Sequence, residues 1–190
     1  MAPKKNGNRP PTWRTLRLNW RIWSVSTANP LHIDFVCTGN ICRSPMAEVI
    51  VRDALTAAGL GGDVRVTSSG IGGWHVGGPA DERAQAELAA HGYDGSQHRA
   101  AQFGGDRFDA DLIVALDTNH VSELVARGVP EQRVRLIRSF DPTAPEGAGV
   151  ADPYYGGPAG FTTTREQIEA AADGIVAWVR NRVQSQPRTD

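Results

Sequence analysis

From residue 31 onward, short apolar runs alternate with helical patterns, and this alternation restricts the fold more than any other feature of the sequence. Runs with the length and composition of buried strands cover residues 31–36, 64–67, 112–116 and 134–137. Helical patterns follow them, from Pro45 to just before Gly59 and then at 81–91, 119–127 and about 163–183. Strands separated by helices pair in parallel through right-handed crossovers. The sequence therefore predicts an α/β fold: a single-domain four-stranded parallel sheet with helices on both faces.

One such domain accounts for most of the chain, because 190 residues with 40% hydrophobic side chains suit a single core. We expect the folded domain at residues 31–184 and a C-terminal tail at 185–190. Residues 1–30 read as a basic N-terminal extension. We expect this extension to be disordered or to follow from a misassigned start, with Val25 as the alternative first residue.

Within the extension, large apolar side chains recur at helical spacing between arginines, at Trp13, Leu16, Trp20 and Trp23. Such a pattern suits a helix lying on a membrane surface. The adjacent Pro10 and Pro11 and the Asn- and Gly-rich start favour an unpacked tail instead. Membrane contact of residues 13–23 is therefore not expected, and no apolar stretch approaches the roughly 18 residues that a span requires.

The charge distribution argues against a nucleic-acid partner. The chain has 20 basic and 21 acidic residues. Six of the basic ones lie in the first 24 residues, which leaves 14 against 21 in the remainder. That remainder lacks the basic field that nucleic-acid binding needs.

The cysteines and the N-terminal arginines indicate the cellular compartment. The two cysteines of the chain form neither the disulfide framework of a secreted protein nor a pair of zinc half-sites. Arginines also interrupt each apolar run that could serve as an export signal. We expect a cytoplasmic protein, with non-classical secretion left open.

The first predicted strand runs directly into the loop Cys-Thr-Gly-Asn-Ile-Cys-Arg-Ser at residues 37–44. The spacing Cys-x5-Arg is a weak signal by itself, but its position between a strand and a helix N-terminus is informative. Successive backbone N–H groups in such a loop point inward and, with the helix dipole, attract an anion such as phosphate. Gly39 permits a close backbone approach, and Asn40 tolerates a left-handed conformation.

A cysteine at the mouth of this loop is suited to nucleophilic attack, because the loop dipoles and Arg43 stabilise the Cys37 thiolate. The planar fork of Arg43 can hold two phosphate oxygens, and Ser44 can donate its hydroxyl to a departing thiolate. The alternative for Cys37 is a purely structural role as a buried residue of the hydrophobic core. A nucleotide-phosphate loop is excluded because no lysine follows Lys5. No metal site is expected, because the cysteine pair has no second paired half-site.

The stretch 35–48, Phe-Val-Cys-Thr-Gly-Asn-Ile-Cys-Arg-Ser-Pro-Met-Ala-Glu, resembles the signature loop of the low-molecular-weight protein tyrosine phosphatase family. The resemblance continues, most closely to the actinobacterial branch, through 74–77, 98–100, 111–117, 138–142 and 152–157. It implies a four-stranded parallel sheet, no metal or other cofactor, and two steps through a phosphocysteine. The residues before about Leu31 have no counterpart in the family pattern.

By this resemblance, Cys37 is the nucleophile, Arg43 the phosphate clamp and Asp152 the general acid and base. Residues of the loop would bind the phosphate, namely Thr38, Gly39, Asn40, Ile41, Cys42 and Ser44. Further polar residues match a hydrogen-bond network that holds the loop in shape, namely Asn40, Ser44, Ser68 and His98. His98 is expected to orient this network and not to act as a base.

Asp152 suits the acid role because cleavage of a phosphate ester requires a proton for the leaving oxygen. Pro153 fixes the backbone beside it, although Asp-Pro is by itself usually a turn. Two tyrosines follow, and Trp74, Tyr154 and Tyr155 are expected to wall a slot in which an aromatic ring stacks. A deep slot would exclude phosphoserine. Core packing is the alternative for these aromatics, but their Gly- and Pro-rich surroundings favour exposure at a cleft.

Two regulatory events are compatible with these residues. Oxidation could join Cys37 to Cys42, provided that the loop brings the sulfurs together; otherwise Cys42 is a buried bystander. As in relatives, a tyrosine kinase could phosphorylate Tyr154 and Tyr155. The expected partners are thus a phosphotyrosine-containing protein substrate and a kinase.

Two other activities remain open. A small-thiol-coupled arsenate reductase would use a similar phosphate loop, whereas the thioredoxin-coupled type needs cysteines beyond Cys42, and none follows. A silent phosphotyrosine-binding module would be expected to lack Cys37, Arg43 or Asp152, and all three are present.

Overall fold

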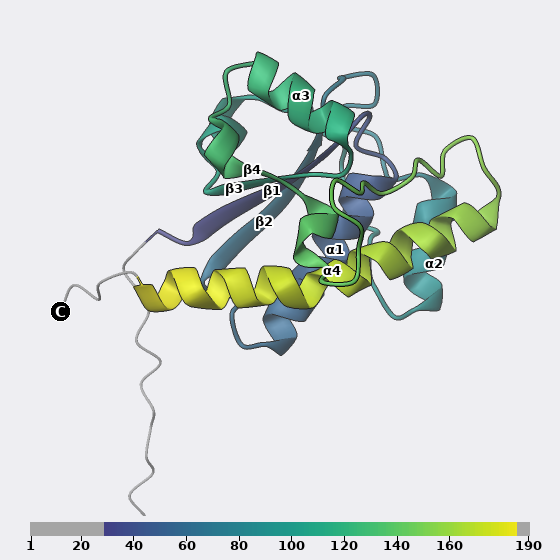
Figure 1. The fold of residues 1–190 in the computed structure, drawn as a ribbon. Coiled ribbons are helices and arrows are strands. Elements are labelled where there is room, and N and C mark those ends of the chain that lie inside the picture. The colour runs from purple at the N-terminus through teal and green to yellow at the C-terminus, as the bar shows by residue number, and fades with distance from the viewer. Residues whose placement is uncertain (1–28, 186–190) are drawn as a thin grey trace, which may run out of the picture.

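The computed structural model describes residues 29–185, so the expectations for the N-terminal extension and most of the C-terminal tail lie outside the described residues. A four-stranded sheet forms the centre of this part of the chain (Figure 1). Its strands are β1 (Leu31–Cys37), β2 (Val64–Gly70), β3 (Leu112–Ala115) and β4 (Val134–Leu136). They pair in parallel in the order β2-β1-β3-β4. The predicted parallel α/β sheet is confirmed.

Helices cover both faces of the sheet, as predicted. Three helices, α1 (Arg43–Ala57), α2 (Glu82–Ala90) and α4 (Pro158–Ser185), share one core cluster with β1 and β3. Helix α3 (Thr118–Ala126) packs on the opposite face (Figure 1). Side chains of β3 alternate accordingly, with Leu112 and Val114 in the first cluster and Ile113 and Ala115 in the second. Within residues 29–185, no helix is both long and apolar enough to cross a membrane.

Several element boundaries differ from those expected. Helix α4 begins at Pro158 and not near residue 163, because proline is well suited to the first helical position. Strand β2 continues to Gly70, which pairs with Cys37, although Ser and Gly have low strand propensity. Ile137 starts a 3-10 turn, η3 (Ile137–Phe140), where a strand residue was expected. Two further turns, η1 (Gly105–Asp109) and η2 (Glu131–Arg133), carried no clear sequence signal.

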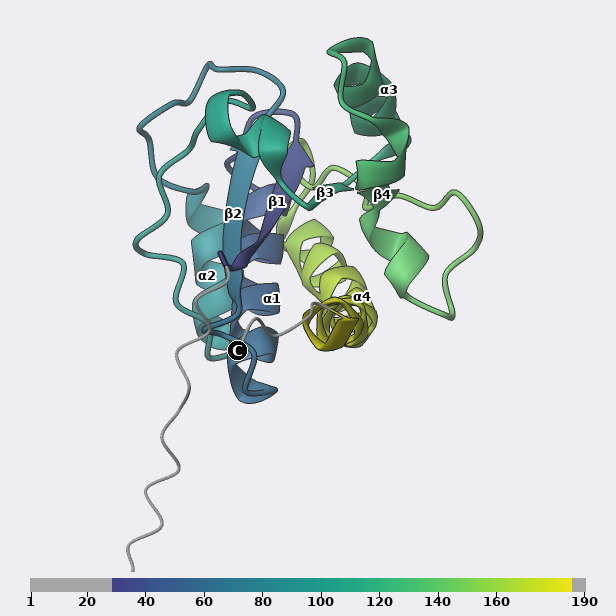
Figure 2. The ribbon, with the colours of Figure 1, turned by 90° about the vertical axis from the view of Figure 1, so that its left-hand side faces the viewer.

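The carboxyl ends of the parallel strands meet at one edge of the sheet. In Figure 2, α3 lies beside β3 and β4, whereas α1 and α2 lie close to β1 and β2. At this edge the Ile71 N–H donates to the Cys37 carbonyl at 2.8 Å, and the Val150 N–H donates to the Leu116 carbonyl at 2.8 Å. Segments far apart in sequence are thereby brought beside the end of β1, where a binding site is expected in such a fold.

Candidate active site

The loop between β1 and α1 has the conformation predicted for an anion-binding turn. Asn40 adopts φ 57°, the single left-handed non-glycine residue in the described range 29–185. The end of β2 packs tightly against the loop, because a Cβ on Gly70 would lie 2.9 Å from the Gly39 carbonyl carbon. The loop is therefore held in a strained shape from two sides, by its own sequence and by the neighbouring strand.

Asn40 accounts for much of this restraint, because every polar group of its side chain is paired in a buried position. Its amide NH2 donates to the hydroxyls of Ser44 and Ser68, both at 2.9 Å. Its side-chain oxygen accepts from the Ala101 N–H at 2.7 Å, and its carbonyl contacts Nε2 of His98 at 2.9 Å. Asn40, Ser68 and His98 thus lie together around the loop, as the resemblance implied.

Cys37 Sγ lies 2.9 Å from the Ser44 hydroxyl and 3.3 Å from the Asn40 N–H. The Ser44 hydroxyl is also 3.2 Å from the Ser69 carbonyl, but it has a single hydrogen to donate. When Cys37 is a thiol, it can donate to Ser44 while Ser44 donates to Ser69. When Cys37 is a thiolate, Ser44 can turn its hydrogen toward the sulfur. The Cys37 sulfur therefore has Ser44 as a hydrogen-bond partner with or without its own hydrogen.

Behind the loop, Glu48 on α1 supports the network and was not identified from the sequence. Its carboxylate accepts from the Ser68 hydroxyl at 2.6 Å and lies 3.7 Å from Nδ1 of His98. Burial acts to raise the pKa of Glu48, but the contacts of His98 and Ser68 together with Arg52 outweigh it and hold that pKa below its usual value. The Glu48 carboxylate therefore orients Ser68 and His98, which in turn hold Asn40.

The backbone of the loop offers donors to an anion. Among the N–H groups of residues 38–42, that of Asn40 is the one with a partner in the described part of the protein, Cys37 Sγ. The first N–H groups of α1 follow directly, and the helix N-terminus adds positive potential. This is the arrangement expected for a phosphate cradle that includes Thr38, Gly39, Ile41 and Cys42.

Arg43 is buried and joins the loop to a distant segment of the chain. Its Nη1 donates to the Val150 carbonyl at 3.3 Å. Its Nη2 donates to the Thr38 hydroxyl at 3.2 Å and to an Asp152 carboxylate oxygen at 2.6 Å. The predicted clamp and the predicted acid are thus in direct contact, although 109 positions separate them.

Asp152 lies in residues 152–157, which directly precede α4 and are called the acid segment because they carry the predicted acid. Its side chain is 42% exposed, and its second oxygen accepts from the Tyr154 N–H at 3.1 Å. A turn follows, closed by the Gly156 N–H donating to the Pro153 carbonyl at 2.9 Å. The carboxyl group is therefore accessible and is aimed at the phosphate loop by local backbone geometry.

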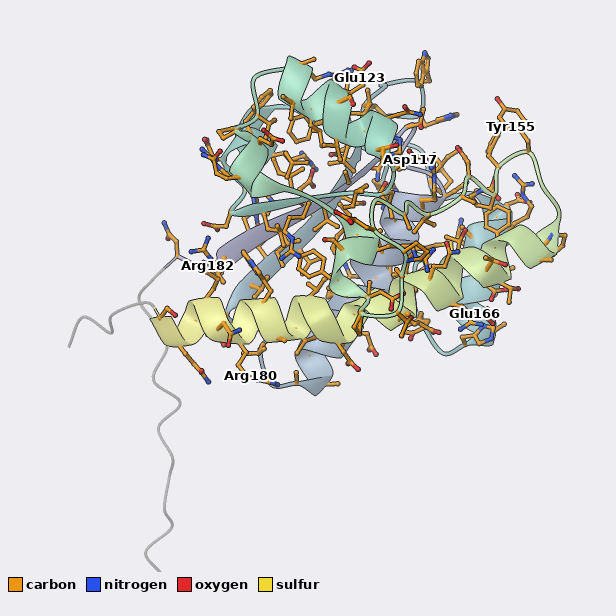
Figure 3. All side chains as sticks on the ribbon, in the orientation of Figure 1. Asp117, Glu123, Tyr155, Glu166, Arg180 and Arg182 are labelled. Atoms are coloured by element: carbon orange, nitrogen blue, oxygen red, sulfur yellow. The ribbon has the colours of Figure 1, made fainter. Side chains whose placement is uncertain are left out.

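The three predicted aromatic walls are exposed, as expected, but they are not arranged as one group. Trp74, 75% exposed, lines a cavity of about 370 Å³ together with Ile41 of the phosphate loop. Tyr154 and Tyr155 come from the acid segment, with their rings edge-on at 5.0 Å. In Figure 3 the ring of Tyr155 points outward from the loop before α4, and it is 93% exposed. The cavity contains neither tyrosine among its lining residues.

Two residues at the carboxyl end of β3 also contact this site and were missed as site residues. Nε2 of His120 lies 3.0 Å from the Thr38 hydroxyl, and Asp117 lies 3.9 Å from Nη1 of Arg43. Burial, followed by the charge of Arg43, lowers the pKa of His120 to about 4. His120 is therefore neutral and can accept from Thr38. Their place just after a buried strand was the available sequence signal.

Cys42 is buried, and burial raises the pKa of its thiol to about 12, with Asp81 and Cys37 adding to the effect. It is consequently a neutral thiol and a poor nucleophile. Both cysteines are free. Within residues 29–185 no group of three His, Cys, Asp or Glu side chains is placed to hold a metal ion.

Comparison with known proteins gives a consistent result. The family model described as low molecular weight phosphotyrosine protein phosphatase matches residues 32–185. The chain is 53% identical over 157 residues to low molecular weight protein-tyrosine phosphatase A of Mycobacterium tuberculosis, covering 82% of this chain and 96% of that one. It is 51% identical over 156 residues to a low molecular weight protein-tyrosine-phosphatase of Streptomyces coelicolor, covering 79% and 94%.

Among solved structures, YfkJ of Bacillus subtilis superposes with a TM-score of 0.76 at 30% identity, covering 84% of this chain and 99% of that one. The family match over residues 32–185 includes the phosphate loop and the acid segment.

Proposed function

Because this chain belongs to the low molecular weight phosphotyrosine protein phosphatase family, we propose that it hydrolyses phosphotyrosine through a phosphocysteine formed on Cys37. As a protein tyrosine phosphatase it acts on phosphotyrosine-containing proteins. The observation that carries the mechanism is the 2.6 Å contact between Arg43 and Asp152. This contact brings a carboxyl group to the loop that holds the Cys37 sulfur.

In the first step, Cys37 Sγ attacks phosphorus and the bond from phosphorus to the phenolic oxygen breaks. Loop N–H groups and Arg43 hold the equatorial oxygens as negative charge builds. Asp152, in its protonated form, gives its proton to the departing oxygen.

In the second step, Asp152, now a carboxylate, takes a proton from water while the water oxygen bonds to phosphorus. The sulfur–phosphorus bond breaks and Cys37 leaves as a thiolate. Ser44, 2.9 Å from the sulfur, can donate its single hydrogen to that thiolate. The products are inorganic phosphate and the original enzyme, with protons balanced over the two steps.

Selectivity for an aromatic phosphate is attributed to the exposed rings beside the cradle. Trp74 and Tyr154 can stack on a phenol ring, whereas a serine side chain offers no face to stack on. Trp74 lies over Gly72, where a Cβ would come within 2.0 Å of the indole, so glycine at this position lets the ring take its place.

Further parts of the proposal concern the chain as a whole. The family match over 32–185 supports residues 31–184 as the phosphatase domain. A reducing, cytoplasmic setting suits a nucleophile that has to remain a free thiol.

The exposure of Tyr155 supports phosphorylation of Tyr154 and Tyr155 by a tyrosine kinase. Phosphopeptide mapping of protein from its own cells tests that point, and unmodified tyrosines would contradict it.

Release of inorganic phosphate from phosphotyrosine and phosphoserine peptides, with a chelator present, tests the function. We expect strong preference for phosphotyrosine, no activity in Cys37→Ser, and slow turnover in Asp152→Asn. Asp141→Asn is the matched control, because Asp141 also precedes a proline but bonds to Thr143 away from the site. Inactivity on both peptides combined with thiol-dependent arsenate reduction would refute the phosphatase mechanism.

A further inference from the structure

Arg83, in the first turn of α2, contacts the acid segment across a large sequence separation. Its Nη1 donates to the Tyr154 carbonyl at 3.0 Å and to the Gly156 carbonyl at 3.2 Å, over separations of 71 and 73 positions. Both carbonyls belong to the turn that follows Asp152. Arg83 therefore contacts the backbone of the acid segment on the side facing α2.

The other side of the Arg83 guanidinium is paired with Asp81. Nε and Nη2 of Arg83 each donate to a different oxygen of that carboxylate, at 2.9 and 2.8 Å. Asp81 also caps α2 by accepting from the Arg83 N–H at 2.9 Å. The hydrogen bonds of Arg83 lower the pKa of Asp81, so the partner is a carboxylate. Such a two-point pair fixes the plane of the guanidinium.

Asp81 is in turn joined to the phosphate loop. Its N–H donates to the Ile41 carbonyl at 2.8 Å. A continuous series of contacts therefore runs from Ile41 through Asp81 and Arg83 to the carbonyls of Tyr154 and Gly156. Because Ile41 lies four residues from Cys37 in the same loop, this series joins the nucleophile loop to the acid segment.

The guanidinium also packs on aromatic rings. Its central carbon lies 4.8 Å from the centre of the Phe161 ring on α4 and 5.6 Å from that of Tyr154. Lysine could not reproduce this set of contacts, because an ammonium group lacks the planar fork. The position thus requires arginine for its geometry as well as for its charge.

We propose that Arg83 is a positioning residue for Asp152 and for the Tyr154 wall, acting by holding segment 152–157 against the phosphate loop through Asp81. This inference rests on the proposed acid role of Asp152. Burial of Pro153 gives the segment a second attachment, so removal of Arg83 loosens the segment without releasing it.

The test is the dependence of kcat/KM on the leaving group, measured with phenyl phosphate, a poor leaving group, and p-nitrophenyl phosphate, a good one. General acid catalysis contributes about 100-fold or more and matters most for the poor leaving group. Asp152→Asn should therefore lose about 100-fold on phenyl phosphate and far less on p-nitrophenyl phosphate. Arg83→Met should lose about tenfold and about twofold respectively, since the acid is displaced and not removed.

Three further variants isolate the cause. Arg135→Met is the matched control, because Arg135 also stacks on a ring, Phe140 at 3.9 Å, and donates to the Ser139 hydroxyl at 3.2 Å, but on β4. It should keep the parent's leaving-group dependence. Arg83→Lys, which retains the charge, should fall between parent and Arg83→Met. In an Asp152→Asn background, Arg83→Met should add less than about twofold on phenyl phosphate, because the two residues act on one step.

The outcomes distinguish a failure of the positioning role of Arg83 from a failure of the acid role of Asp152. If Asp152→Asn depends on the leaving group and Arg83→Met does not, the inference is wrong and the acid role stands. The inference is also wrong if the losses of the two variants multiply fully. If Asp152→Asn itself has the parent's leaving-group dependence, the acid role fails and the inference fails with it.

Discussion

The phosphate loop and the acid segment have complementary roles in the proposed reaction but are built in opposite ways. In the loop, Asn40 and Ser44 are fully buried, and each is held by several hydrogen bonds. In the segment, the Asp152 side chain is 42% exposed and Tyr155 93%. Arg43 connects the two regions, because it is buried beside the phosphate loop and donates a hydrogen bond to Asp152 of the acid segment.

The difference in burial shows which of the two regions holds its atoms rigidly in place. The atoms that bind phosphate have the same targets in every substrate, so a rigid cradle suits them. In the proposed mechanism, Asp152 and the exposed aromatic rings contact the part that differs between substrates, namely the leaving group and the protein that carries it. An exposed segment with few attachments can accommodate that variety. Substitutions in the loop should therefore lower both stability and rate, and substitutions in the segment should change catalysis or substrate binding with little change in stability.

Asn40→Ala should break the loop most severely. It removes a hydrogen-bond donor from the hydroxyls of Ser44 and Ser68, leaves the Ala101 N–H without its acceptor, and places alanine at φ 57°. We expect a loss of about 3–5 kcal/mol in the free energy of unfolding and about 100-fold or more in kcat. Urea unfolding and steady-state kinetics measure both. Asn40→Gly, which relieves only the backbone strain, should recover about 1 kcal/mol, and full recovery would show that the side chain is dispensable.

Asp152→Ala should give the contrasting result in the acid segment. The rate on phosphotyrosine peptide should fall about 100-fold, because the proton donor is lost. The free energy of unfolding should change by less than about 1 kcal/mol, because the ion pair with Arg43 is partly exposed. Urea unfolding checks this, and a large loss of stability would mean that the two regions are not built differently.

His120 should make the loop region sensitive to acid. Its folded pKa of about 4 lies below the usual 6.5, so the unfolded chain binds the proton more tightly. Stability from this group is present above about pH 6.5 and is lost as the pH falls toward about 4. His120→Gln keeps an acceptor for Thr38 but cannot take up a proton. Its unfolding free energy should fall less steeply across that window, by up to about 1.4 kcal/mol per pH unit, and parallel curves for parent and variant would contradict the argument.

The smallest effect is expected at the exposed end of the acid segment. Tyr155→Ala removes a ring that packs edge-on with Tyr154 and is 93% exposed. KM for a phosphotyrosine peptide should rise about fivefold, equivalent to roughly 1 kcal/mol of stacking, with kcat unchanged. A fall in kcat without a change in KM would mean that Tyr155 acts on the acid and not on the substrate.

The sequence predicted the loop better than the segment, and the reason is physical. A strand, a Cys-x5-Arg loop and a helix are local, so their residues determine the conformation of Asn40 and the direction of the loop N–H groups. The resemblance added Ser68 and His98, which pack from other strands and loops. The start of α4 was misplaced because Gly156 and Gly157 resemble a loop whether or not Pro158 begins a helix.

The residues that sequence reasoning missed act over long separations. Glu48 and Arg83 have ordinary helical surroundings in sequence, and His120 had as its signal only a place shortly after a buried strand. Their importance comes from partners 20, 82 and 71 positions away, respectively Ser68, Thr38 and Tyr154. Such contacts depend on the tertiary arrangement of the strands and helices, which no local pattern encodes.

The most direct test of the mechanism is to locate the phosphoryl group in acid-quenched Asp152→Ala mixed with p-nitrophenyl phosphate. This variant should form the intermediate, because the leaving group needs little acid assistance, and should hydrolyse it slowly, because the base is missing. Peptide mass spectrometry should find one phosphoryl group, on Cys37. A phosphoryl group on Cys42 or on another residue, or no adduct in a variant that still turns over, would contradict the account.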